Sequence, residues 1–188
     1  RWQSALTHYP VDENSLERAI ILENLARAYQ QTGEPTEALH HWQSTTAVYT
    51  ALQDWAKVGR VLTQQAQTYR QLGQPYQAIG LLCAPISDPV TVEVEIDTGT
   101  DIAAADENCL PESAIQITQT AEDAIAHVAA LGTLSEAYRA IKAYPQALQS
   151  LQTALSETNE VSAADDIENS THQALLHNSL GNLYKEQS

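Results

Sequence analysis

The chain has 188 residues, 43% of them hydrophobic, and carries nine basic against 24 acidic side chains for a net charge of −15. A chain of this length can bury a core of its own. Its charge repels nucleic acids and anionic membrane surfaces, and no apolar run is long enough to predict membrane insertion.

The first part of the chain is typical of two consecutive helices. The first carries an apolar stripe at helical spacing: Leu22, Leu25, Ala26 and Tyr29. We expect Asp12 or Asn14 to cap this helix and Gly33 to stop it. The second helix is expected to run from Pro35 to about Ala51, and Asp54 is expected to cap the first helix of the next unit.

The chain matches itself when it is shifted so that Tyr29 lies on Tyr69. The same shift pairs Trp2 with Trp42, Leu22 with Leu62, Ala26 with Ala66, Gly33 with Gly73, Pro35 with Pro75, and Ala38 with Ala78. A period of about 40 residues indicates stacked units that bury their apolar faces against each other. The sequence therefore predicts an all-α, right-handed solenoid of helix pairs whose function resides in a surface.

The combination of Leu25-Ala26, Tyr29, Gly33, Pro35, Ala38 and Trp42 resembles the tetratricopeptide repeat. A third unit is expected around Tyr138, where Lys142 stands in place of the family's Gly. The resemblance implies a concave groove, lined by the first helices, that binds a protein or peptide partner. It implies neither an enzyme nor a cofactor.

The equivalent tyrosines of successive units are Tyr29, Tyr69, Tyr138 and Tyr184, and the step from Tyr69 to Tyr138 is much longer than the other two. The long step indicates an insertion. The expected organisation is a partial unit 1–11, unit one 12–53, unit two 54–122 with an insertion at 84–112, unit three 123–163 and a partial unit four 164–188. Because both ends cut through a unit, we expect a fragment of a longer array, with apolar edges that invite end-to-end self-association.

The insertion differs in composition from the rest of the chain. Four aliphatic residues alternate with polar ones and predict a short strand, with a β-hairpin as one arrangement: Val90, Val92, Val94 and Ile96. Its acidic residues favour a solvated loop. A calcium site is the alternative, although the carboxylates lack the spacing of a calcium-binding loop.

The two cysteines, Cys83 and Cys109, flank the insertion, and we expect them to form a disulfide. The alternative is a pair of buried reduced thiols, because cytosolic chains rarely keep disulfides. If the bond forms, a periplasmic or secreted location is favoured. The spacing of the six His residues is not typical of a metal site.

The run Cys109–Ala114, taken with Leu81-Leu82-Cys83 and residues 131–138, resembles arrays that precede caspase-like CHAT domains in cyanobacterial proteins. The peptidase's own Cys and His motif is absent from this sequence, so no catalytic residue is assigned.

The candidate groove face comprises the residues nine, six and two before each unit tyrosine and the two after it, because this spacing keeps them on one side of the first helix. These 20 positions hold five of the nine basic residues and three of the 24 acidic ones. The candidate binding residues are Arg27, Arg60, Gln67, Arg70, Glu136, Arg139, Asn178, Asn182 and Lys185. Arg70, Arg139 and Lys185 each follow a tyrosine and are expected to align as a ladder.

Three functions remain open at this point. The first is a scaffold that binds an extended peptide, with acidic groups held by the arginines and the peptide backbone by Gln67, Asn178 and Asn182. The second is the regulatory arm of a CHAT peptidase, and the third is a structural part of a filament or surface assembly. Alternatively, the arginines pair with neighbouring Glu and Asp side chains and bind no ligand.

Overall fold

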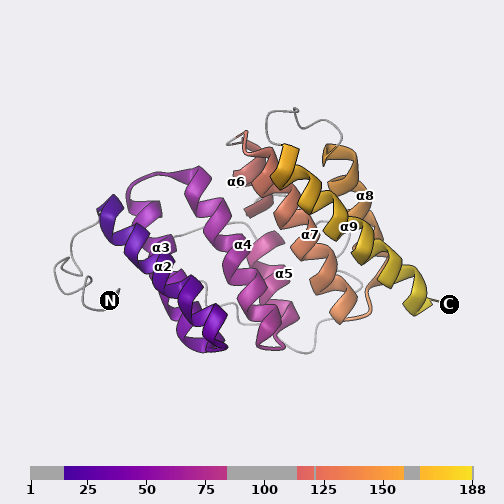
Figure 1. Ribbon diagram of the computed structural model, residues 1–188, viewed down its shortest axis with the longest axis horizontal. Coiled ribbons are helices and arrows are strands. Elements are labelled where there is room, and N and C mark those ends of the chain that lie inside the picture. Colours follow the sequence, from indigo (N-terminus) through magenta and orange to yellow (C-terminus); the bar gives the residue numbers. More distant parts are fainter. Residues whose placement is uncertain (1–14, 84–113, 121, 159–165, 188) are drawn as a thin grey trace.

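The computed structural model describes residues 15–83, 114–120, 122–158 and 166–187, and this part of the chain is α-helical with no strand (Figure 1). Its helices are α2 (Leu16–Thr32), α3 (Pro35–Ala51), α4 (Trp55–Gln71), α5 (Pro75–Cys83), α6 (Ala114–Thr120), α7 (Ala124–Ala140), α8 (Tyr144–Thr158) and α9 (Asp166–Gln187). The predicted second helix, from Pro35 to Ala51, is confirmed as α3.

The helices pack in neighbouring pairs along the chain. α2 packs on α3, α4 on α5 and α6, and α7 on α8, while α9 packs on both α7 and α8. In Figure 1 the first helices α2, α4, α7 and α9 follow one another across the front of the molecule, with the second helices behind them. This architecture confirms the predicted all-α solenoid of helix pairs.

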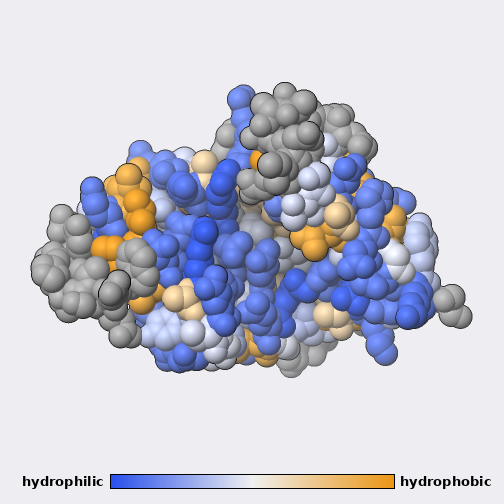
Figure 2. Space-filling model, viewed as in Figure 1, coloured by the Kyte–Doolittle hydropathy of each residue, from blue (hydrophilic) through white to orange (hydrophobic). Residues whose placement is uncertain are grey.

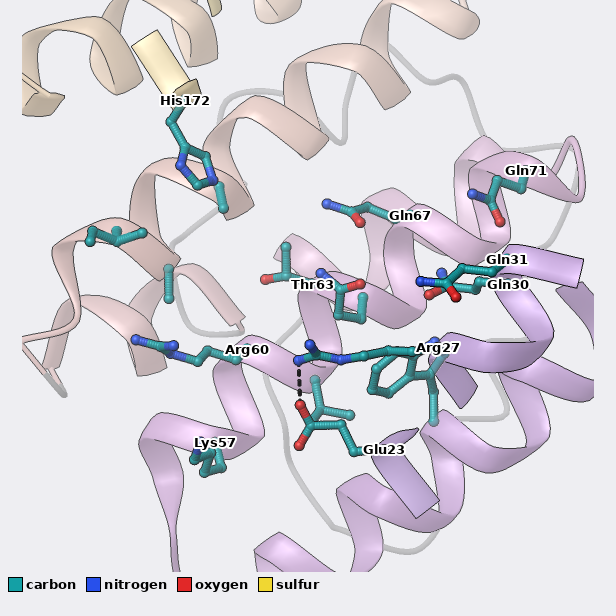
Figure 3. A pocket seen from close by; sticks show the side chains of 16 residues that line it. Glu23, Arg27, Gln30, Gln31, Lys57, Arg60, Thr63, Gln67, Gln71 and His172 are labelled. Carbon is teal, nitrogen blue, oxygen red and sulfur yellow. Dashed lines mark hydrogen bonds and ion pairs between the residues drawn. The ribbon is translucent and has the colours of Figure 1, made fainter. Parts of the chain in front are cut away.

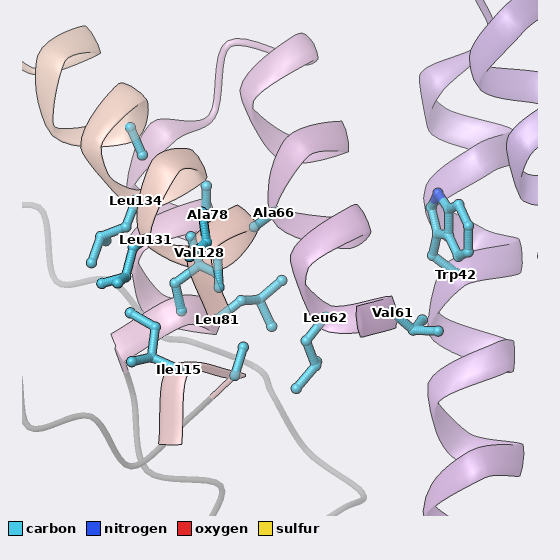
Figure 4. Packing of buried hydrophobic residues seen from close by; sticks show 14 of the residues in the cluster. Trp42, Val61, Leu62, Ala66, Ala78, Leu81, Ile115, Val128, Leu131 and Leu134 are labelled. Atoms are coloured by element: carbon cyan, nitrogen blue, oxygen red, sulfur yellow. The ribbon is translucent and has the colours of Figure 1, made fainter. Parts of the chain in front are cut away.

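The core runs continuously from one pair to the next. Trp42 of α3 is fully buried and faces Val61 of α4, which is 2% exposed (Figure 4). Further along, Leu81 of α5, Ile115 of α6 and Leu131 of α7 belong to the same buried cluster. No unit therefore completes its core without the next one, as expected for a repeat array.

The second helix of unit two is divided into two helices. Aligning Tyr69 with Tyr29 places α5 on the first half of α3. Aligning Tyr138 with Tyr69 places α6 on Thr45–Ala51, which is the last part of α3. Both halves pack against α4, as the two ends of one helix would. The expected acidic loop or hairpin, the calcium alternative and Cys109 lie outside the described residues.

The turns between paired helices depend on a residue in the left-handed region four positions after each unit tyrosine. This residue is Gly33 (φ 80°), Gly73 (φ 72°) or Lys142 (φ 63°). In each turn the N–H of the following residue donates to the tyrosine carbonyl, at 2.9 Å in all three. The turn of unit three thus has the same geometry without a glycine, because the hydrogen bonds of a Schellman-type cap hold Lys142 in place.

One expected cap is wrong. The N-cap of α2 is Ser15, whose Oγ accepts a hydrogen bond from the Arg18 N–H at 3.2 Å, rather than Asp12 or Asn14. Ser, Asp and Asn cap helices about equally well, so residue type alone does not separate neighbouring candidates. The expected stop at Gly33 and the cap at Asp54 are confirmed.

Gly59 of α4 is a point of close approach between α4 and α6. A Cβ built on it would lie 2.6 Å from Cγ2 of Thr118 and 3.1 Å from Cγ2 of Ile117. Thr118 is fully buried and donates to the carbonyls of Ala114 and Ile115, so its side chain has little freedom to move. The position therefore needs glycine for close packing.

We expect Lys142→Gly to raise the free energy of unfolding by about 0.5–1 kcal/mol, because glycine adopts the left-handed conformation without the Cβ penalty. Chemical denaturation of the purified chain measures this change. Lys142→Ala removes the same charge but keeps a Cβ, and it should bring no gain; equal stabilisation by both variants would show that charge is responsible.

We expect Gly59→Ala to lower the free energy of unfolding by about 1–3 kcal/mol, because α6 must move away from α4. Gly181→Ala in α9 is the matched control, since no atom lies within 4 Å of its added Cβ. The control should be neutral or stabilising, because alanine favours a helix over glycine. Similar losses in both variants would contradict the packing explanation.

Candidate functional site

The first helices line a groove with three connected hollows. The central hollow, of about 590 Å³, lies between α2 and α4 and extends to α7 and α9 (Figure 3). A second, of about 550 Å³, lies between α4 and α7, and a third, of about 270 Å³, lies where α9 meets α7 and α4. Gln67 lines all three, so they form one continuous surface.

Glu23 and Arg27 lie in the middle of the central hollow, joined by an ion pair of 2.5 Å between Oε1 and Nη2 (Figure 3). The other oxygen of Glu23 accepts a hydrogen bond from the Tyr49 hydroxyl at 3.2 Å. Burial and the charge of Glu23 raise the pKa of Tyr49 to about 12, so the phenol stays protonated and donates. Tyr49 therefore helps to orient the carboxylate that holds Arg27.

Glutamine amides line the same hollow, namely Gln30, Gln31, Gln64, Gln67 and Gln71. Two of them connect neighbouring first helices. The side-chain amide of Gln30 donates to Oγ1 of Thr68 at 2.8 Å, and that of Gln67 donates to Oγ1 of Thr133 at 3.3 Å. Each amide carries both donors and an acceptor, the combination that pairs with a peptide backbone.

Arg60 and Asp123 connect α4 to the start of α7. The guanidinium binds both carboxylate oxygens, at 2.5 Å from Nε and 3.0 Å from Nη2, while the carboxylate also caps α7 through the Ala126 N–H at 3.2 Å. Burial would raise the pKa of Asp123, but the bonds from Arg60 and Ala126 and the positive charges of Arg60 and Lys57 outweigh it. The pKa therefore lies below its ordinary value of 3.8.

Two arginines that follow a unit tyrosine also bind carboxylates on the next first helix. Arg70 of α4 pairs with Glu136 of α7, and Arg139 of α7 pairs with Glu186 of α9 at 2.6 Å. Oε1 of Glu136 accepts a second hydrogen bond, from Ser179 at 2.7 Å. Arg70 and Arg139, which were expected to form a ladder, are therefore each paired with a carboxylate of the chain. This is the alternative stated above, in which the arginines pair with Glu and Asp side chains.

The nine candidate residues are not all brought together. Arg27, Arg60 and Gln67 line the central hollow, and Arg70, Glu136 and Arg139 line the second. Asn178 lines the third hollow with Gln67, Arg70 and Glu136. Asn182 and Lys185 are exposed on α9 and line none of the three hollows.

Sequence reasoning missed Lys57, Ala126 and His172, which line the central hollow. Each lies one helical turn before the first position that was assigned to the groove face of its unit. One further turn of the same helical spacing would have included them. Among the described residues, no group of three or more His, Cys, Asp and Glu is placed to hold a metal ion, and none of the helices is apolar over the length of a membrane span.

A family model described as tetratricopeptide repeat matches residues 17–83, which cover α2 to α5. No curated protein matches the chain. Tetratricopeptide repeats generally mediate protein–protein interaction, and stacked repeats present their concave surface to the partner.

We expect Asp123→Ala to lower the free energy of unfolding more than Asp54→Ala. Both variants remove an N-cap, at a cost of about 0.5–2 kcal/mol each, whereas only the first also breaks the bond to Arg60. Thermal and urea unfolding at pH 7 measure the difference. Equal losses would show that the Arg60 contact adds nothing to stability.

The charge of Asp123 can be tested separately with Asp123→Asn, which keeps the capping oxygen. Since the folded-state pKa of Asp123 is lowered, its charge stabilises the fold above the unfolded pKa of about 3.8. This stabilisation is lost as the pH falls through the folded-state pKa. Wild type and Asp123→Asn should therefore differ at pH 7, and the difference should shrink as the pH falls below 3.8 and through the folded-state pKa.

Proposed function

We propose that this chain is a non-catalytic scaffold that holds an extended peptide segment of a partner protein in the groove of α2, α4, α7 and α9. The observation that carries the proposal is the continuous groove itself, lined by glutamine amides and by ion pairs. An extended peptide exposes N–H and C=O groups at regular intervals, and carboxamides can bind both. The long axis of the groove crosses several units, which suits a strand-like ligand.

The preferred ligand in this proposal carries carboxylates. Arg70 and Arg139 are both partly exposed, with side chains 26% and 30% accessible, so a ligand can reach them. A carboxylate of the peptide would take the place of Glu136 or Glu186 on the guanidinium. The exchange keeps the guanidinium paired, and the displaced Glu136 or Glu186 side chain, 29% or 40% accessible, can be solvated by water.

Glu136 and Glu186 then act as internal competitors for the same arginines. A surface ion pair contributes about 0–1 kcal/mol, so an acidic ligand can displace one at small cost. The chain's net charge of −15 opposes such a ligand at long range, and we expect the affinity for an acidic peptide to be weak and sensitive to salt.

The test is an NMR titration of the labelled chain with the peptide Gly-Ser-Asp-Ala-Asp-Ser-Gly and with its Asn-for-Asp analogue. We expect the acidic peptide to bind wild type more tightly than the neutral one, and Arg70→Gln/Arg139→Gln to abolish that preference. Glu136→Gln should raise the affinity for the acidic peptide severalfold, because it frees Arg70 from its internal partner.

The matched control is Arg18→Gln/Lys142→Gln, which removes two positive charges outside the groove. It should keep the preference for the acidic peptide, apart from the change in net charge. If both double variants lose the preference equally, the effect is that of net charge and the assigned arginines are not the site. Shifts confined to the second helices would place binding on the other face and contradict the proposal.

A further inference from the structure

The third hollow of the groove differs from the other two in its chemistry. Alongside its polar residues it has an apolar side, formed by Val128, Ala129, Gly132, Leu175 and Leu176. Leu175 is 59% exposed, the highest value among the exposed large hydrophobic residues of the described chain. Figure 2 shows apolar surface over α9 surrounded by polar surface, with the strongly polar surface of α4 beside it.

At the hollow, α7 carries smaller residues than α4 does at the equivalent positions. The positions nine and six before the unit tyrosine hold Arg60 and Thr63 in α4 but Ala129 and Gly132 in α7. A Cβ added at Gly132 would lie 3.1 Å from Cδ2 of Leu176, so the glycine leaves room for that leucine to form the floor. The volume of about 270 Å³ suits one aliphatic side chain rather than a whole small-molecule ligand.

The polar side of the hollow contains the Arg70–Glu136 pair, together with Ser179, which donates to Glu136. Asn178, Gln67, Thr133 and His172 complete this rim. The hollow has an apolar floor and one guanidinium, that of Arg70, at its edge. This combination suits a peptide in which an apolar residue stands next to an acidic one. Burying an aliphatic group there removes apolar surface of both molecules from water.

We propose that this hollow is an anchor pocket, which receives a leucine or isoleucine of the partner peptide directly next to the acidic residue bound at Arg70. The inference rests on the proposed function and adds the sequence preference of the ligand to it. The peptide reaches the pocket along the groove, since Gln67 lines all three hollows and Arg70 lines the second and the third. The ligand class is thus an extended acidic segment with an aliphatic anchor.

The experiment repeats the NMR titration with Gly-Ser-Asp-Leu-Asp-Ser-Gly, the leucine form of the same acidic peptide. Wild type should bind the leucine form about tenfold or more tightly than the alanine form, in keeping with the burial of three further carbon atoms. Leu175→Ala should reduce this ratio to below about threefold. Ala129→Leu, which fills the pocket, should reduce it as well, provided that circular dichroism shows an unchanged fold.

Leu16→Ala is the matched control, because it truncates another leucine that is about half exposed on a first helix. The control should keep the full ratio between the leucine and alanine peptides. If the acidic peptides bind at Arg70 but the leucine form gains nothing, the anchor pocket is refuted and the proposed function stands. If neither acidic peptide binds, both proposals fail, and if leucine strengthens binding equally in Leu175→Ala, the anchor lies elsewhere.

Discussion

Each helix pair of the described solenoid carries a fully buried alanine on both of its helices. The first helices supply Ala26, Ala66 and Ala137, and the second helices supply Ala38, Ala78 and Ala147, all with 0% exposure. Side chains of this size let two backbones approach closely, so that the larger leucines, tyrosines and tryptophan interlock around them. The angle between the helices, and with it the curvature of the groove, is therefore set in the core rather than on the binding face.

The arginines of the groove face form ion pairs with carboxylates of the same chain, which as a whole is strongly acidic. Arg60, Arg70 and Arg139 each bind a carboxylate at the start of, or on, the following first helix, so the same contacts stabilise the stacking of units and occupy the groups that a ligand would use. The proposed mode of binding therefore couples the ligand to the geometry of the array. In that mode, a peptide carboxylate that displaces Glu136 or Glu186 also removes one ion pair between two units, and this loss lowers the net affinity for an acidic peptide.

The sequence predicted the repeating parts of this structure because each of them depends on nearby residues. Pro35, Gly33 and the capping Asp54 act within one turn of their own position, so the internal match of the chain was enough to place them. The carboxylate partners could not be placed in this way. Asp123 is far from Arg60 along the chain, and its position depends on how the units stack, which no local pattern encodes. The groove face assigned from the sequence stops one helical turn before His172, which also lines the central hollow.

The divided second helix of unit two has a consequence for folding cooperativity. α5 and α6 both contact α7 as well as α4, so units two and three are tied together by several helices. Unit one contacts the remaining described helices mainly through α3 against α4, where Gln65 bonds the Trp42 carbonyl at 3.3 Å. In a chain whose contacts are mostly between neighbours, local opening follows such uneven connections. We therefore expect α2 and α3 to open together as one cooperative unit, separately from α4, α5, α6 and α7.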